Sequence, residues 1–137
     1  MKKILSILCV AVLILGMTGC GDTSSVSDTS EESTKQVIYE DEYIKAVYLG
    51  VSDTVMSVSL ENKSNEEITV LPMDSSVDGT MKQFTSGTLA IIQPGKTFNQ
   101  GWILGVTPTN EIEFSMSICG KDMSELVRTD SLKIEVK

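Results

Sequence analysis

Hydrophobic and polar residues alternate along most of the chain after residue 36. Runs in which every second residue is apolar lie at 56–60, 112–118 and 132–136. A period of two is typical of β-strands with one buried and one solvated face, whereas an amphipathic helix repeats about every 3.6 residues. No stretch of ten residues fits the helical period, and the short candidate at 121–128 fits a loop equally well. The pattern predicts an all-β domain in which Ser115 and Ser117 face solvent.

Residues with turn chemistry separate these runs, at 62–65, 78–79, 94–96 and 105–110. Asp78-Gly79 is the clearest signal, because a type I′ hairpin turn needs a positive φ at both central positions. A two-residue turn there would pair Val77 with Thr80 and Met73 with Phe84. We therefore expect Met73, Val77 and Phe84 on the inner face of the sheet.

Close to Pro72, the apolar residues of the alternating pattern change from even-numbered to odd-numbered positions. Ile68 and Val70 have the opposite parity to Met73, and a proline at this point predicts a bulge or a strand that leaves one sheet for the other. The segment 62–65 contains a glycosylation sequon, but we expect it to form a hairpin turn.

Ten short strands are expected, near 37–40, 43–50, 54–62, 67–72, 73–77, 80–84, 88–92, 97–104, 111–119 and 126–136. The last of them would be kinked near Thr129-Asp130. Short strands with turn signals about every 8–12 residues predict an antiparallel, two-sheet, immunoglobulin-like sandwich. A small closed barrel is the alternative, because periodicity does not distinguish a closed sheet from two stacked ones.

The first twenty residues have the features of a lipoprotein signal peptide. Lys2 and Lys3 precede an apolar run over 4–16, broken only by Ser6. Its 13 residues suit a secretory h-region and fall short of the roughly 20 that span a bilayer. The run ends in Met17-Thr18-Gly19-Cys20, which resembles the lipobox of bacterial lipoproteins.

The lipobox resemblance implies that Cys20 is lipidated after cleavage of a signal peptide, residues 1–19. An uncleaved N-terminal anchor is the alternative. Residues 20–36 then form the lipidated cysteine and a disordered tether, because this acidic, Ser/Thr-rich segment buries too little apolar surface to fold. Residues 37–137 form the sandwich domain. We expect the protein on the extracytoplasmic face of the cell membrane, held there by the lipid on Cys20.

Several short motifs follow one another along the domain in a fixed order. They lie at 58–64, 68–70, 77–80, 92–96 and in the final alternating strand. This order is similar to that in a group of Gram-positive bacterial lipoproteins with a C-terminal immunoglobulin-like domain. The shared motifs are turn chemistry, so the resemblance implies a fold. It brings no catalytic or binding residues with it.

Composition narrows the possible functions. The 137 residues include 11 basic and 19 acidic side chains, a net charge of −8, and no histidine. Catalytic triads and metal sites that depend on histidine are therefore excluded. Without Lys2 and Lys3 the charge becomes −10. We expect no nucleic acid partner, because binding to phosphates needs clusters of Lys and Arg.

The remaining reactive groups are expected to be structural. Cleavage would leave Cys119 as the one unlipidated cysteine, expected to end a strand as a small apolar residue, with a reactive thiol as the alternative. Acidic side chains at 40–42, and at Asp74 with Asp78, lie in polar turns where we expect solvation rather than hydrolysis or calcium binding. The methionines are expected to fill the core rather than bind copper. We predict no enzyme activity, metal or cofactor.

Aromatic side chains offer the one candidate ligand site. Tyr39, Asp41, Tyr43 and Lys45 would share a face if 39–45 were extended, and two tyrosines beside hydrogen-bonding groups suit a sugar. A turn at Asp41-Glu42 would break this row.

Trp102 is expected in the core with Phe98 and Leu104, and an exposed stacking platform is the alternative. The favoured function is a non-catalytic, membrane-anchored domain that binds a protein or another envelope component. The alternative is a lipoprotein that binds a small ligand or glycan through Tyr39 and Tyr43.

Overall fold

The computed structural model describes residues 35–136. The predicted signal peptide, Cys20 and nearly all of the predicted tether lie outside these residues. The described part contains no helix, and therefore none that is long and apolar enough to cross a membrane. Its strands are β1 (Gln36–Glu40), β2 (Ile44–Ser52), β3 (Val55–Asn62), β4 (Ile68–Val77), β5 (Thr80–Met81), β6 (Ala90–Ile92), β7 (Thr97–Ile103), β8 (Glu111–Cys119), β9 (Glu125–Arg128) and β10 (Leu132–Glu135).

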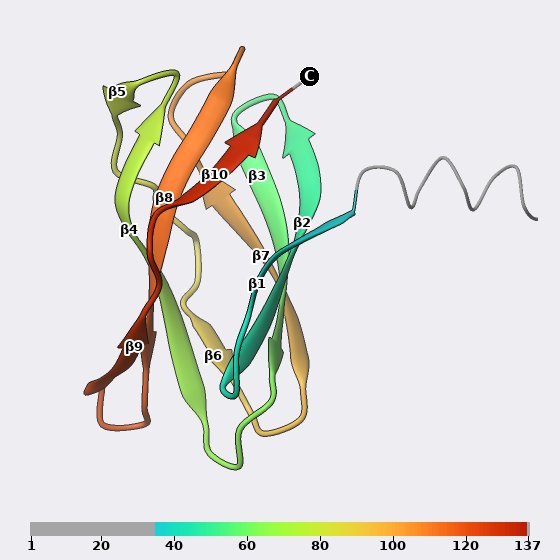
Figure 1. The fold of residues 1–137 in the computed structure, drawn as a ribbon, viewed down its shortest axis with the longest axis vertical. Helices are drawn as coiled ribbons and strands as arrows, with labels where there is room; N and C mark the ends of the chain where they lie inside the picture. Colours follow the sequence, from blue (N-terminus) through green and yellow to red (C-terminus); the bar gives the residue numbers. More distant parts are fainter. Residues whose placement is uncertain (1–34, 137) are drawn as a thin grey trace, which may run out of the picture. The chain divides into compact units, whose positions relative to one another are not determined.

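The strands form two antiparallel sheets that face each other (Figure 1). The first sheet has the order β1-β2-β3-β7. The second has the order β10-β8-β4-β5, with β6 also paired to β4 and β9 also paired to β8. No strand of one sheet pairs along its length with a strand of the other, so the predicted sandwich is confirmed and the closed barrel is wrong.

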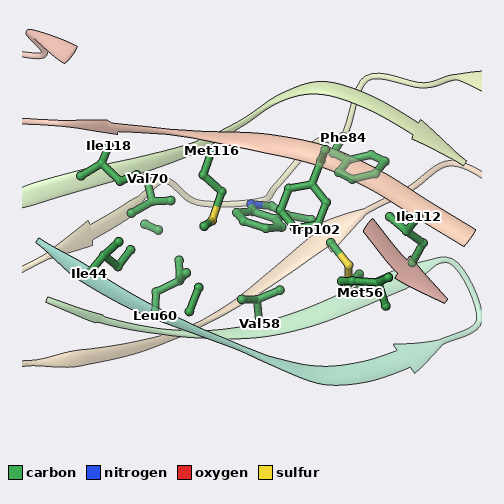
Figure 2. Packing of buried hydrophobic residues seen from close by; sticks show 14 of the residues in the cluster. Ile44, Met56, Val58, Leu60, Val70, Phe84, Trp102, Ile112, Met116 and Ile118 are labelled. Atoms are coloured by element: carbon green, nitrogen blue, oxygen red, sulfur yellow. The ribbon is translucent and has the colours of Figure 1, made fainter. Parts of the chain in front are cut away.

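Alternate residues of both sheets fill the interior. In Figure 2, Val58 and Leu60 of β3 lie opposite Val70 of β4 and Met116 of β8. Trp102 is buried as predicted, and its ring meets that of Phe114 edge to face, with centroids 5.4 Å apart. Leu104 is buried, and Phe98 packs against the margin of the core. Met56 and Met116 are core residues, whereas Met81 and Met123 are exposed.

The hairpin at Asp78-Gly79 forms as predicted. The two residues have φ angles of 50° and 80°, and Val77 pairs with Thr80. The expected pairing of Met73 with Phe84 is wrong, although Phe84 is buried. Met73 is half-buried on the outer face of the second sheet, where it pairs with Ser115.

A bulge in β4 explains the position of Met73. The register with β8 shifts between Met73 and Ser76, and Asp74 takes a positive φ of 48°. Because of the extra residue, inward-facing side chains fall on even-numbered positions such as Val70 before the bulge and on odd-numbered positions, Ser75 and Val77, after it. The bulge therefore lies just after Pro72, and the two strands expected over 67–77 are one continuous strand.

The predicted kink in the last strand is confirmed. Strands β9 and β10 both pair with β8 and are separated by residues 129–131. Thr129 bridges the break: its N–H donates to the carbonyl of Met116, and its Oγ1 accepts the N–H of Met116, both at 2.9 Å. Residues 121–124 form a turn, so the short helical candidate at 121–128 is absent.

The predicted hairpin turn at 62–65 is wrong. Asn62 ends β3 of the first sheet, and β4 begins the second, so the segment connects the two sheets. Asn62 is fully buried and donates from Nδ2 to the carbonyls of Glu66 at 2.7 Å and Ile92 at 2.8 Å. Its Oδ1 accepts from the N–H of Ser64 at 2.8 Å and from its hydroxyl at 2.7 Å. Every polar atom of the side chain is thus used to shape this connection.

Candidate functional site

The two predicted ligand-binding tyrosines flank the turn between β1 and β2. Oδ1 of Asp41 accepts the N–H groups of Tyr43 and Ile44, both at 2.8 Å, which closes the turn. The chain folds back here, and Tyr39 pairs with Ala46 across the hairpin. The extended row of Tyr39, Asp41 and Tyr43 therefore does not form. Both tyrosines pack partly against the core.

The hydroxyl of Tyr39 is already engaged. It donates to Oδ2 of Asp41 at 2.8 Å. Burial, together with this hydrogen bond and the negative charge of Asp41, raises the pKa of Tyr39 to about 12. Tyr39 thus supports the turn with its hydroxyl, and Tyr43 is the tyrosine that borders open space.

Tyr43 borders a shallow hollow of about 450 Å³ at one end of the sandwich. The hollow lies between the β1–β2 turn, the connection from β3 to β4, and the start of β9, and is lined by Glu42, Tyr43, Lys63, Ser64, Asn65, Glu66 and Leu126. Figure 1 shows these three segments together at the lower end of the molecule.

A second hollow of about 370 Å³ adjoins the first. Its lining residues are Glu66, Gly120, Lys121, Asp122, Ser124 and Leu126. Glu66 and Leu126 line both hollows, so the two adjoin, and together they are here called the end groove. It runs from Tyr43 past Leu126 to Lys121. Each hollow has the volume of a small-ligand pocket, but both are open to solvent.

Two apolar side chains are exposed at this end of the molecule. Leu126 lies in the end groove and is 39% exposed. Met123 lies at the tip of the β8–β9 turn and is 51% exposed. Met123 also has a φ of 64°, a conformation that is unfavourable for a long side chain. The turn is held by the N–H of Gly120, which donates to the carbonyl of Ser124 at 2.9 Å.

The charged groups of the end groove differ in how far they are paired. Nζ of Lys63 lies 2.7 Å from Oε1 of Glu40, which lowers the pKa of that carboxyl. Asp122 accepts from the hydroxyl of Ser124 at 2.6 Å, and this bond lowers the pKa of Asp122. Among the described residues, no cation lies within ion-pair distance of Glu42 or Glu66. The lining of the groove therefore includes two exposed carboxylates, of Glu42 and Glu66, that have no cation partner among the described residues.

The acidic pair Asp74 and Asp78 does not form a site. The carboxylate of Asp78 accepts backbone N–H groups of residues 109–111, and these bonds lower its pKa to about 2. Asp74 points elsewhere, toward Ser115 and Arg128. Within residues 35–136, no three acidic or cysteine side chains are grouped so that they could hold a metal ion.

A polar network on the outer face of the second sheet was not predicted. Oε2 of Glu125 accepts from the hydroxyl of Ser117 and pairs with Arg128 at 3.0 Å, and these contacts lower the pKa of Glu125. Ser115 donates to Asp74 at 3.3 Å. The expectation that Ser115 and Ser117 face solvent is wrong: both are buried, because longer side chains cover them on a central strand.

Cys119 is the last residue of β8, and it is buried as predicted. Its Sγ lies 3.5 Å from Oγ of Ser117, at the edge of the network. It has no cysteine partner among the described residues, and Cys20 lies outside them.

The chain was compared with protein-family models, with curated proteins and with solved structures. No protein-family model, no curated protein and no solved structure matches the chain. The candidate site therefore rests on the residues themselves: the end groove combines open space, the exposed Leu126 and carboxylates without a cation partner among the described residues.

Proposed function

We propose that the chain is an extracytoplasmic lipoprotein, anchored in the cell membrane through Cys20, whose immunoglobulin-like domain binds a protein of the cell envelope without catalysis. The lipobox resemblance and the polar segment after it support the anchor. The observation that carries the binding role is the end groove, where Leu126 is exposed in the depression and Met123 is exposed on the adjoining β8–β9 turn. Exposed apolar groups rimmed by polar residues are typical of sites of protein interaction.

The state of the acidic side chains supports binding rather than hydrolysis. The carboxyl groups of Glu40, Asp78, Asp122 and Glu125 all have lowered pKa values, because each accepts hydrogen bonds or pairs with a cation. A general acid in glycoside hydrolysis needs a raised pKa instead. These carboxylates are ionised at neutral pH and engaged in holding turns and strands.

The place of the groove on the domain also supports an anchored binding protein. The chain joins the sandwich at Lys35, and β1 then extends about 17 Å, at ~3.4 Å per residue, to the turn that borders the groove. The groove thus lies at the opposite end of β1 from Lys35, the first described residue of the domain.

Site-specific photo-crosslinking in intact cells tests the proposal. The full chain would carry p-benzoylphenylalanine in place of Met123, and in a second variant in place of Met81, which is 72% exposed at the opposite end of the second sheet. We expect an adduct of one defined mass from position 123 that is lost in the Cys20→Ala background. Absence of protein adducts from every exposed position tested would contradict a protein-binding role.

A glycan-binding function is the second candidate, favoured by the position of Tyr43 in the larger hollow. A soluble peptidoglycan fragment would then bind to the full chain, and Tyr43→Ala would remove the binding. Tyr39→Phe would retain it, because the hydroxyl of Tyr39 bonds to Asp41. Equal binding by wild type and Tyr43→Ala would exclude this alternative.

A further inference from the structure

We propose that the end groove binds an extended segment of a partner protein in which an apolar side chain is flanked by basic ones. The inference rests on the proposed protein-binding function and assigns its surface and the chemistry of its partner. The apolar side chain would lie against Leu126 and Tyr43, and a basic side chain would reach Glu66.

The β8–β9 turn presents apolar surface at a cost to the fold. Met123 is 51% exposed and has a φ of 64°, which glycine or asparagine adopts far more easily. Backbone hydrogen bonds hold the turn, including one from the N–H of Met123 to the carbonyl of Gly120 at 2.9 Å, but the side chain of Met123 is not part of the core. A flexible thioether side chain adapts well to a partner's surface. Contact with a partner gives such a residue a role that folding does not.

The charge of the groove favours a basic segment. Glu66 lies where the two hollows meet and Glu42 lies at the Tyr43 end, and neither has a cation within ion-pair distance among residues 35–136. Lys63, at the Tyr43 end of the lining, is already paired with Glu40, and Lys121, at the far end of the groove, has no ion-pair partner among residues 35–136. Fifteen acidic and eight basic side chains give these residues a net charge of −7. Complementary charge would accelerate the encounter and orient the segment.

The walls of the groove are held in place before any partner binds. The buried side chain of Asn62 fixes the connection that carries Lys63 and Glu66. The backbone bond between Gly120 and Ser124 fixes the opposite wall. A site that is already ordered loses less conformational entropy on binding, so a short segment is sufficient.

A short photoreactive peptide provides a direct test on the full chain, held in phosphatidylcholine vesicles. The probe is Gly-Ser-Lys-X-Lys-Ser-Gly, where X is photo-leucine. After illumination and digestion, we expect crosslinks on the segments that contain Tyr43, Glu66 and 120–126. Excess peptide with leucine at X would suppress them, whereas peptides with alanine at X, or with glutamate in place of both lysines, would not.

Substitutions separate a binding role of Met123 from a structural one. We expect Met123→Gly to reduce the crosslink yield several-fold while raising the thermal midpoint, because glycine relieves the positive φ and removes the apolar group. Leu126→Thr would also reduce the yield, and Met81→Ser, at a more exposed methionine, would leave it unchanged.

Three results would overturn the proposal: crosslinks centred on the exposed Ile91 of β6 and the preceding Leu89, an equal loss in Met81→Ser, or suppression by a peptidoglycan fragment, which would assign the groove to the glycan. If photo-crosslinking in intact cells then gave protein adducts at other positions of the domain, the proposed protein-binding function would stand. Its binding surface would not be the end groove.

Discussion

Asp78 and Asn110, which belong to two different connections, are joined by a hydrogen bond of 2.7 Å from the N–H of Asn110 to Oδ1 of Asp78. The same carboxylate accepts the N–H groups of Thr109 at 2.9 Å and Glu111 at 3.0 Å. A single ionised side chain in the β4–β5 turn therefore holds the loop that leads into β8.

This arrangement predicts an acid-dependent stability. The pKa of Asp78 falls from 3.8 to about 2 on folding, chiefly because its carboxylate accepts the three N–H groups. Since the folded pKa is the lower one, the stabilisation is complete above about pH 4 and is lost as the pH falls toward 2. We expect Asp78→Asn to lower the thermal midpoint by a few degrees at pH 7 and to match wild type near pH 2.

Asp53→Asn provides the control for this measurement. Asp53 also has a positive φ in a hairpin turn, but its carboxylate accepts one hydrogen bond, from Thr107 at 3.1 Å. Asparagine tolerates this backbone conformation, so both variants keep their turns. A pH-independent difference between Asp78→Asn and wild type would contradict the assignment.

Gln100 predicts a stabilising substitution in the core. It is buried on β7 beside Trp102, and no described residue donates a hydrogen bond to its Oε1, while Nε2 donates to the carbonyl of Gly101 at 2.9 Å. An unpaired buried acceptor costs roughly 1–3 kcal/mol. We expect Gln100→Met, which keeps the volume, to raise the free energy of unfolding by about 1 kcal/mol in urea titrations. A loss of stability would show that the amide is needed.

For substitution of Asn62 we expect the opposite outcome, a loss of stability. Asn62→Ala would remove the four hydrogen bonds of a fully buried amide and leave the buried carbonyl of Ile92 without this donor. We expect a loss of about 2–3 kcal/mol in the free energy of unfolding. Substitution of exposed Asn65 by Ala, in the same connection, is the control and would be nearly neutral. Equal effects of the two changes would argue against the role of Asn62.

Fatty-acid labelling and membrane fractionation test the predicted lipid anchor at Cys20. Wild-type protein should incorporate labelled fatty acid and partition with membranes, and Cys20→Ala should lose both properties. Cys119→Ser serves as the control, because Cys119 is buried and the label should be unaffected. Equal labelling of Cys20→Ala and wild type would exclude lipidation at Cys20.

Much of the fold could be predicted from local sequence. Alternation over 112–118 predicts the inward face of β8, because the side chains of a strand point to opposite sides whatever the strand pairs with. Asp78-Gly79 specifies its own turn, since few other residue pairs adopt positive φ at both positions. Trp102 was placed in the core by its parity and size.

The candidate site could be predicted only in part. Tyr43 was identified by its chemistry, and it does border the larger hollow. The supposed partnership with Tyr39 failed, because the hydrogen bonds of Asp41 favour a turn over an extended run. Met123 and Leu126 carried no signal, since short-range periodicity does not reveal which apolar residues of a turn stay uncovered.

Sequence by itself determined the period-two alternation of the strands, the tight turn at Asp78-Gly79 and the all-β character of the domain. Tertiary structure alone decided the strand neighbours and therefore the bulge at Asp74, the burial of Ser117 and the role of Asn62 between the sheets. It also assembled the end groove from three distant segments, around Tyr43, Glu66 and Leu126. The physical reason is that alternation is a property of each strand, whereas neighbours are selected by the packing of the whole core.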